Sequence, residues 1–111
     1  MAEFAVGETY RPRRRRLDTP ALADKMIRRS ITRDEIDAVL SDNVIIEVYE
    51  HRDRVRYVLL GSVRGRPLHV VVAEDDIVGA TVVLSVYQAD EAHGWDPASG
   101  FRRRKEGPDG R

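Results

Sequence analysis

The stretch RGRPLHVVVAEDD, at positions 64–76, contains the residue whose chemistry is most open to question, His69. It stands between Leu68 and a run of three valines, a pattern that is typical of a β-strand. Side chains alternate between the two faces of a strand, so Leu68 and Val70 share one face and His69 shares the other with Val71. His69 is therefore predicted to lie on the less apolar face of this strand.

The next strand along the chain offers partners for this histidine. Strict alternation places Val83, Ser85 and Tyr87 on one face of that strand. If this face and that of His69 are on the same side of the sheet, the two strands together present a partly polar surface.

The strand before that of His69 contains Arg54 and Arg56, and either arginine is available to join this surface. A histidine, a tyrosine and an arginine on one concave sheet face can bind a phosphodiester and move its protons. The alternative is structural, with His69 an ordinary half-exposed strand residue and Tyr87 a core residue whose hydroxyl lies at the edge.

The first predicted helix carries a second pattern. Ala21, Lys25 and Arg29 are four residues apart, which stacks them along one face of a helix. Two cations in line beside a sheet can hold successive phosphates. We therefore predict a catalytic group made of His69, Tyr87, Lys25 and Arg29. The alternative is a solvated helix face whose charges pair only weakly at the surface.

Other kinds of site are excluded by the sequence. There is no cysteine, which removes zinc thiolate sites and cysteine nucleophiles. The three histidines, His51, His69 and His93, lack the spacing of metal ligands, so we expect neither a metal nor a cofactor. The chain has neither a glycine-rich phosphate loop nor a G-x-S-x-G motif, which argues against P-loop and serine-hydrolase chemistry.

The formal net charge is zero, yet the charges are unevenly distributed. Residues 1–16 carry five bases and two acids, residues 102–111 carry five bases and two acids, and the remainder is acidic. Basic ends on an acidic body are typical of arms that bind polyanions, although solvated tails are the alternative. The residues predicted to contact nucleic acid are the C-terminal cluster and one strand arginine, namely Arg102, Arg103, Arg104, Lys105 and Arg56.

Two helices come first in the predicted order of elements. The sequence DTP marks a helix start with Thr19 as N-cap, and this helix runs to about Ser30. The motif ITRDEI then predicts a capping box, with Thr32 as N-cap and Glu35 as the third helical residue. The second helix covers about residues 33–41.

Four strands follow, because the apolar residues change to a period of two. They are predicted at residues 44–50, 54–63, 67–73 and 80–87. Their short connections favour antiparallel neighbours. The predicted fold is therefore α+β, with two N-terminal helices packed on a four-stranded, mostly antiparallel sheet.

The chain of 111 residues has the length of one domain. Residues 1–17 show no helical or strand periodicity and are predicted to form a mobile basic arm, residues 18–88 the α+β domain, and residues 89–111 an irregular basic tail. No apolar run is long enough to span a bilayer, and the N-terminal arginines come too late for a secretory signal. We expect a cytoplasmic protein that does not act at a membrane.

Three stretches carry a resemblance to a known family: ALADKMIRRSITRDEIDAVLSDNVIIEVYE, YVLLGSVRGRPLHVVVA and LSVYQADEAHGWDPASGFRRRK. Over about residues 18–105 the chain resembles the small bacterial domains called domain of unknown function 4258. That family is similar in fold to the RelE/ParE-like toxins of bacterial toxin–antitoxin systems. The resemblance implies a RelE/ParE-like fold and a small antitoxin protein as partner.

The family's first helix typically carries a histidine and two arginines where this chain has Ala21, Lys25 and Arg29. His69, Tyr87 and the C-terminal basic cluster match the family pattern. The resemblance thus implies a toxin-type protein that binds RNA, free or on the ribosome. Such a protein acts as an endoribonuclease (an mRNA interferase) when cations stabilise the scissile phosphate and a histidine or tyrosine handles protons.

Two alternatives remain open. The first is a non-catalytic module that binds protein or nucleic acid and has lost the family's first-helix histidine. In the second, the basic ends alone bind nucleic acid, which predicts a steep dependence of the affinity on salt.

Overall fold

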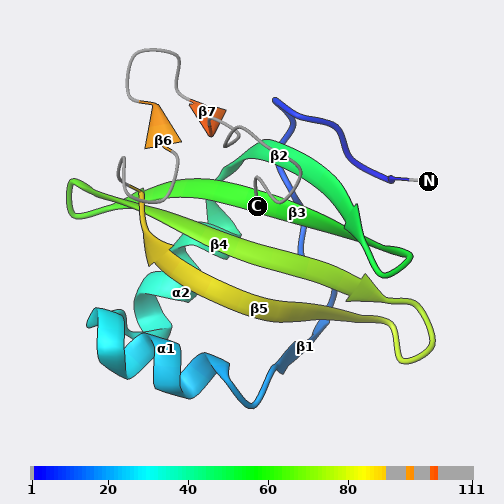
Figure 1. Cartoon of the computed structure of the whole chain (residues 1–111), viewed down its shortest axis with the longest axis horizontal. Coiled ribbons are helices and arrows are strands. Elements are labelled where there is room, and N and C mark those ends of the chain that lie inside the picture. The colour runs from blue at the N-terminus through cyan, green and yellow to red at the C-terminus, as the bar shows by residue number, and fades with distance from the viewer. Residues whose placement is uncertain (1, 90–94, 97–100, 103–111) are drawn as a thin grey trace.

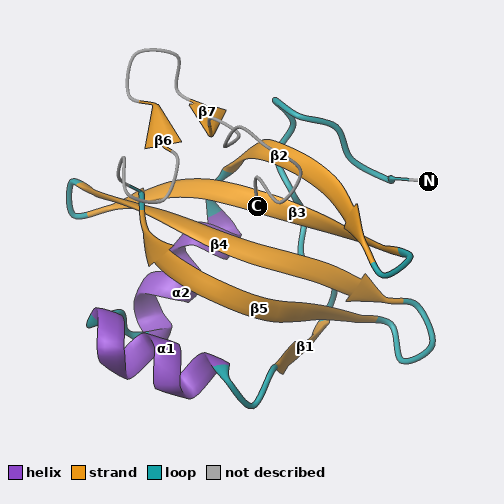
Figure 2. Cartoon of the chain, viewed as in Figure 1, coloured by secondary structure: helices purple, strands orange, loops and turns teal. Residues whose placement is uncertain are grey.

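A computed structural model describes residues 2–89, 95–96 and 101–102 of the chain (Figure 1). Its elements follow the order β1 (Arg15–Asp18), α1 (Leu22–Arg29), α2 (Arg33–Ser41), β2 (Val44–His51), β3 (Arg54–Val63), β4 (Arg66–Asp75), β5 (Ala80–Gln88), β6 (Trp95–Asp96) and β7 (Phe101–Arg102). Figure 2 shows the long strands as one twisted layer, with both helices gathered at one side of it. In the described part of the chain, no helix has the length and apolar character that crossing a membrane requires.

The main sheet has five strands in the spatial order β1-β5-β4-β3-β2. β2 to β5 form an antiparallel meander, and β1 pairs in parallel with β5. β6 and β7 pair with each other as a separate two-stranded sheet. The sheet is therefore mixed, because one crossover carries the chain from β1 through both helices to the other edge.

This topology corrects the predicted architecture. The α+β class is right, but two N-terminal helices on a four-stranded, mostly antiparallel sheet is wrong, because a strand precedes the helices and the sheet has five strands. The sequence of β1, RRLD, contains three charged residues and one leucine, so no apolar alternation marks it as a strand. Its strand conformation comes from its partner, with Arg15 beside Ala80 and Asp18 beside Val83.

The rest of the N-terminal segment also packs against the sheet. Tyr10 is buried, and its backbone N–H donates to Asn43 Oδ1 at 2.9 Å. Its hydroxyl lies 2.7 Å from Thr81 Oγ1 and donates to the Glu74 carboxylate at 3.2 Å. Burial raises the pKa of the Tyr10 phenol far above its usual range, and burial also raises the pKa of Glu74 against the opposing charge of Arg13. These partners are distant in sequence, so no local pattern predicts the contacts.

The two helix starts contrast in how well their sequences predict them. The capping box of α2 is confirmed, since Thr32 Oγ1 accepts the Glu35 N–H at 3.2 Å and Glu35 Oε1 accepts the Thr32 N–H at 2.8 Å. These hydrogen bonds lower the pKa of Glu35. α1 instead begins at Leu22, and Thr19 is not its N-cap. The Thr19 hydroxyl donates to the carbonyl of Leu84 at 3.5 Å, so a contact with the sheet replaces the helix cap.

Both helices pack against one face of the sheet, which we call the helix face. The buried apolar cluster on this face joins helix residues to alternate strand residues: Leu22, Ile31, Ile36, Val39, Leu40, Ile45, Tyr57, Leu59, Leu68, Val70, Val72, Val83 and Val86. On the opposite face, which we call the far face, a smaller cluster contains Ile46, Val58, Val71 and Tyr87. The sheet is thus apolar on both sides.

Gly61 on β3 allows α2 to approach the sheet closely. A Cβ at this position would lie 2.9 Å from a methyl of Val39 and 3.0 Å from the backbone carbonyl of Asp42. Since the carbonyl belongs to the end of α2, the contact can be relieved only by moving the helix away from the strand.

We expect Gly61→Ala to lower the free energy of unfolding by about 1–3 kcal/mol, because it overpacks this contact. Urea unfolding followed by circular dichroism measures the change. Ser62→Ala is the matched control, since Ser62 is the next residue of the strand and is exposed. Equal stability of the two variants would contradict the proposed close contact.

Candidate functional site

A pocket of about 590 Å³ opens on the far face. Its walls come from β2 on one side, from β3 and β4 in the middle, and from β5 and α1 on the other side. The residues that line it are Thr19, Lys25, Glu47, Tyr49, Glu50, His51, Arg56, Val71, Leu84, Ser85 and Tyr87. Two cations, two carboxylates and two phenols therefore face one cavity.

A bulge in β2 turns Glu47 toward this pocket. The register with β3 shifts between Ile45, which pairs with Leu59, and Glu47, which pairs with Val58. The extra residue, Ile46, joins the far-face cluster, and Glu47 beside it lines the pocket. Two consecutive side chains thus lie on the far face, whereas a regular strand would send them to opposite faces.

A second bulge has the same effect in β5. Val71 pairs with Ser85 and Val72 pairs with Val83, so Leu84 is the extra residue. Leu84 and Ser85 both line the pocket, while Val83 packs on the helix face. The prediction that Val83 shares a face with Ser85 is therefore wrong, because strict alternation holds only in a strand without a bulge.

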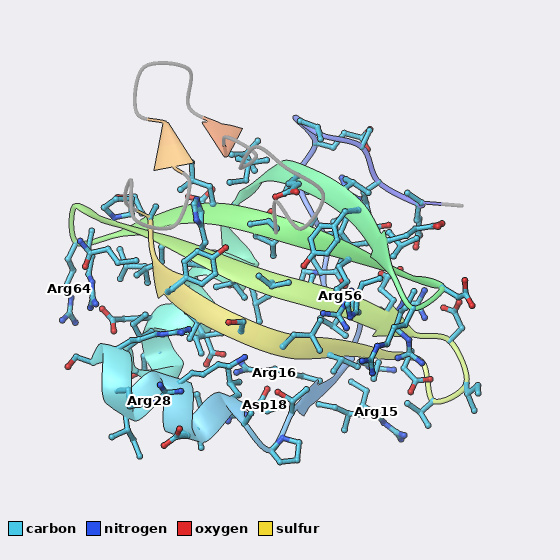
Figure 3. The ribbon with its side chains drawn as sticks, viewed as in Figure 1. Arg15, Arg16, Asp18, Arg28, Arg56 and Arg64 are labelled. Atoms are coloured by element: carbon cyan, nitrogen blue, oxygen red, sulfur yellow. The ribbon has the colours of Figure 1, made fainter. Side chains whose placement is uncertain are left out.

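Arg56 lies over the sheet within this pocket, whereas Arg28 and Arg64 lie at the periphery of the molecule (Figure 3). Arg56 pairs across strands with Tyr49 on one side and Ala73 on the other. Its Nε is buried and has no hydrogen-bond partner in the structure described. Buried polar groups are nearly always hydrogen-bonded, so this donor suits an acceptor supplied by a ligand.

Lys25 reaches the same pocket from α1. β1 pairs with β5 only as far as Asp18 beside Val83, so the outer edge of β5 has no partner beyond that point among the described strands. Lys25 Nζ donates to the carbonyl of Leu84 on this edge at 3.2 Å. An ammonium has three donors, so this contact leaves it able to bind an anion in the pocket.

Arg29, one turn further along α1, acts on the pocket only through its contacts with β5. Its Nη1 donates to the carbonyl of Val86 at 3.0 Å, on the same edge of β5. Its guanidinium carbon lies 6.0 Å from the centre of the Tyr87 ring, at the outer limit of a cation–π contact. Arg29 does not line the pocket but packs beside a residue that does.

Tyr87 connects the predicted catalytic residues. It lines the pocket together with Lys25, and it is the cross-strand neighbour of His69. The two rings meet edge to face, with centroids 5.3 Å apart and planes at 83°. The structure therefore brings Lys25, Arg29, Tyr87 and His69 into one region, with His69 beside the tyrosine and outside the pocket lining.

His69 lies on the predicted face of the sheet but not at an accessible surface. It is 0% exposed, between its cross-strand neighbours Leu60 and Tyr87. The half-exposed alternative is wrong for the same reason. A general acid or base must come within hydrogen-bond reach of the atom it protonates. In this arrangement a ligand in the pocket meets Tyr87 rather than His69.

The side chains of the predicted C-terminal cluster all lie outside the described part of the chain. Arg102 belongs to β7, where only the backbone is described, and Arg103, Arg104 and Lys105 lie outside the described residues. Where side chains are described, no group of three or more histidines and acids is placed to hold a metal ion.

Sequence reasoning missed the β2 wall of the pocket, which contains Glu47, Tyr49 and Glu50. The available signal was the run VYEH at the end of this strand, where aromatic and charged residues replace the aliphatic ones. The sequence could not show which of these side chains lie on the far face, because that depends on the bulge in β2, and no sequence pattern marks the bulge.

A family model described as Domain of unknown function (DUF4258) matches residues 22–88 of the chain. The match runs from the start of α1 to the end of β5, so it includes every pocket residue except Thr19. No curated protein and no solved structure matched the chain. Since the matched segment is more than half of its length, the chain belongs to the family described as Domain of unknown function (DUF4258).

Proposed function

We propose that this domain binds single-stranded RNA through the far-face pocket, as a toxin-type RNA-binding protein that does not itself cut the RNA. The observation that carries the proposal is the buried Nε of Arg56, which has no partner in the described structure and shares a pocket with Lys25. Two cations that converge on one cavity suit the phosphates of a nucleic-acid backbone.

The other pocket residues favour an unpaired strand over a duplex. Tyr49 and Tyr87 supply aromatic rings, and base stacking on such rings contributes about 1–3 kcal/mol per base. Ser85 and Thr19 add hydroxyl groups that can donate or accept hydrogen bonds. Bases reach rings inside a cavity only when they are unstacked, as in loops and single strands.

The resemblance to RelE/ParE-like toxins supports two further parts of the proposal. It favours RNA, free or ribosome-bound, as the polyanion, and it favours a small antitoxin protein as the partner. Under this proposal the antitoxin neutralises the domain by blocking access to the pocket.

Binding without cleavage is the better candidate because the proton carriers are poorly placed. His69 is fully buried beside Tyr87, and Ala21 stands where the family typically has a histidine. Tyr87 remains in the pocket, but phosphodiester cleavage by the ribose 2′-hydroxyl needs both a base and an acid.

Loss of either pocket cation should weaken RNA binding. For Arg56→Gln and for Lys25→Gln we expect the Kd of a labelled oligoribonucleotide to rise about tenfold, because a hydrogen bond to a charged group contributes about 1.5–3 kcal/mol. Each substitution should also reduce the slope of log K against log salt by about 0.7, the value of one phosphate contact. Fluorescence anisotropy at several salt concentrations measures both quantities.

Arg28→Gln is the matched control for this experiment. Arg28 is on α1 like Lys25, but it is exposed and pairs with Asp24 at the surface. Its substitution removes the same charge without touching the pocket, so Kd should stay nearly unchanged. If it weakens binding as much as Lys25→Gln does, the contact is general electrostatics and not the pocket. Thermal unfolding of Lys25→Gln shows whether losing the hydrogen bond to Leu84 disturbs the fold.

Labelled RNA should remain intact when it is incubated with the purified protein, with and without ribosomes. Expression in a bacterium should slow growth while cellular RNA stays unbroken. Gel analysis of RNA from both experiments measures this. Cleavage by the wild-type protein that Arg56→Gln abolishes would show that the domain is a ribonuclease after all.

A further inference from the structure

β1 forms one edge of the main sheet, and in the described part of the chain no strand pairs with its outer side (Figure 1). The backbone N–H of Thr19 donates to the carbonyl of Val83 at 3.1 Å, which fixes how β1 is oriented. In a parallel pair, alternate residues direct both of their backbone groups at the partner strand. Leu17 therefore bonds to β5, and its neighbours Arg16 and Asp18 direct their N–H and C=O groups outward. These outward groups can pair with another strand.

The side chains of β1 divide between the two faces of the sheet. Arg16 and Asp18 lie on the helix face, where Arg16 Nε donates to the Asp18 carboxylate at 2.9 Å and a second nitrogen of Arg16 pairs with Asp37 of α2. Leu17 lies beside Val82 on the far face, and 42% of it remains exposed. The open edge thus presents an arginine, an exposed leucine and an aspartate in turn.

We propose that the outer edge of β1 binds the same edge of a second copy of this chain, in antiparallel orientation. A two-fold axis at Leu17 then joins the two main sheets into one continuous sheet. Two-fold symmetry is the commonest arrangement of protein dimers, and it requires a surface that is complementary to itself. This contact is independent of RNA binding, because it is made by β1 alone.

The charges of β1 select one register for this pairing. Directly opposite residues of an antiparallel pair lie on the same face of the sheet, so the two-fold axis must pass through a residue and not between two residues. A centre at Arg15 or Arg16 opposes two arginines, and a centre at Asp18 opposes two aspartates. A centre at Leu17 places Arg16 opposite the partner's Asp18 on both sides of the axis. Opposite charges across strands are favourable and like charges are unfavourable, so the register centred on Leu17 is preferred.

The backbone groups agree with this register. Arg16 and the partner's Asp18 are the residues whose N–H and C=O groups point outward, so they can exchange both N–H···O bonds on either side of the axis. Leu17 and the partner's Leu17 then form a non-hydrogen-bonded pair, the kind whose side chains lie closest together. The leucine that is exposed in one copy is therefore covered by the same leucine of the other copy.

Charged side chains on an edge strand commonly prevent pairing with another chain. They do so when like charges meet across the contact. On β1 the two charges of the helix face have opposite signs and flank the central leucine, so one register brings them together favourably. The contact between two such short strands is small, and we therefore expect a weak association that depends on protein concentration.

The dimer places both far-face pockets on the same side of the joined sheet. A two-fold axis perpendicular to a sheet keeps each face on its own side, and antiparallel pairing at the edge has this symmetry. Arg56, Ala73, Val82 and Leu17 form one row across β3, β4, β5 and β1. Since adjacent strands lie about 4.8 Å apart, the two copies of Arg56 are about 34 Å apart along the sheet. One extended ligand can then contact both pockets, which raises its overall affinity without any new contact within either pocket.

Cross-linking tests the register directly, because the chain has no cysteine of its own. Opposite residues of a non-hydrogen-bonded pair have Cα atoms about 4.5 Å apart, a separation that a disulfide can bridge. We expect Leu17→Cys to form covalent dimers under mild oxidation, measured by gel electrophoresis without reductant. Ile27→Cys is the matched control. Ile27 is 79% exposed on α1, so random collisions would link it more readily than Leu17.

Sedimentation velocity over a range of protein concentrations measures the association of the unsubstituted chain. The share of dimer should rise with concentration. Leu17→Lys places two like charges on the axis and removes the leucine pair, so the dimer Kd should rise at least about tenfold. Ile27→Lys, which changes an exposed residue away from the edge, should leave the Kd unchanged. Circular dichroism of both variants shows whether they are folded.

A wild-type chain that stays monomeric at every concentration would overturn the proposed dimer. A dimer that folded Leu17→Lys leaves unchanged would overturn it as well, because the contact would then lie elsewhere on the molecule. Equal cross-linking of Leu17→Cys and Ile27→Cys would have the same meaning. Preferential cross-linking through Leu17→Cys, together with the weaker dimer of Leu17→Lys, would support pairing of the two β1 edges.

Discussion

The outer edge of β5 imposes the constraint on which the site depends. β1 covers this edge only up to Val83, and the carbonyls of Leu84 and Val86 beyond it still need hydrogen-bond donors. α1 supplies them through Lys25 and Arg29, at 3.2 and 3.0 Å. The helix is therefore fixed beside the strand by its cations as well as by its apolar residue Leu22. The same hydrogen bonds place a positive charge at the wall of the far-face pocket.

The cations of α1 thus have a structural role that is independent of any ligand. A lysine bound to one carbonyl retains two donors, whereas the guanidinium of Arg29 contacts both a backbone carbonyl and the ring of Tyr87. Arg56 differs from both, because its strand neighbours Tyr49 and Ala73 give its buried Nε no acceptor. A polar group that the fold leaves unsatisfied is better evidence for a ligand than a charge that the fold already uses.

Local signals in the sequence predicted local structure well. The capping box at Thr32 and the bounds of β3 are as expected, because each depends on residues adjacent in the chain. β1 could not be predicted, because pairing with β5 and not its own composition makes it a strand. The predicted face of His69 is correct. Its burial was not predicted, because burial depends on the two flanking strands and not on the sequence of its own strand. The pocket was found only in part, with Lys25 and Tyr87 recognised and the β2 wall missed behind a bulge.

The two bulges help to decide which side chains of β2 and β5 lie on the far face and so line the pocket. The central strands, β3 and β4, pair with each other in unbroken register. β2 and β5, on either side of them, each contain one extra residue that has no partner in the ladder. If Ile46 were paired in the ladder, Ile45 and Glu47 would share a face, and the aromatic and acidic side chains of β2 would exchange sides with the aliphatic ones. Deleting Ile46 would have no such effect, because Glu47 would then follow Ile45 directly and still lie opposite Val58. In this domain the unpaired state of one residue, and not the side chain that it carries, decides which wall β2 gives to the pocket.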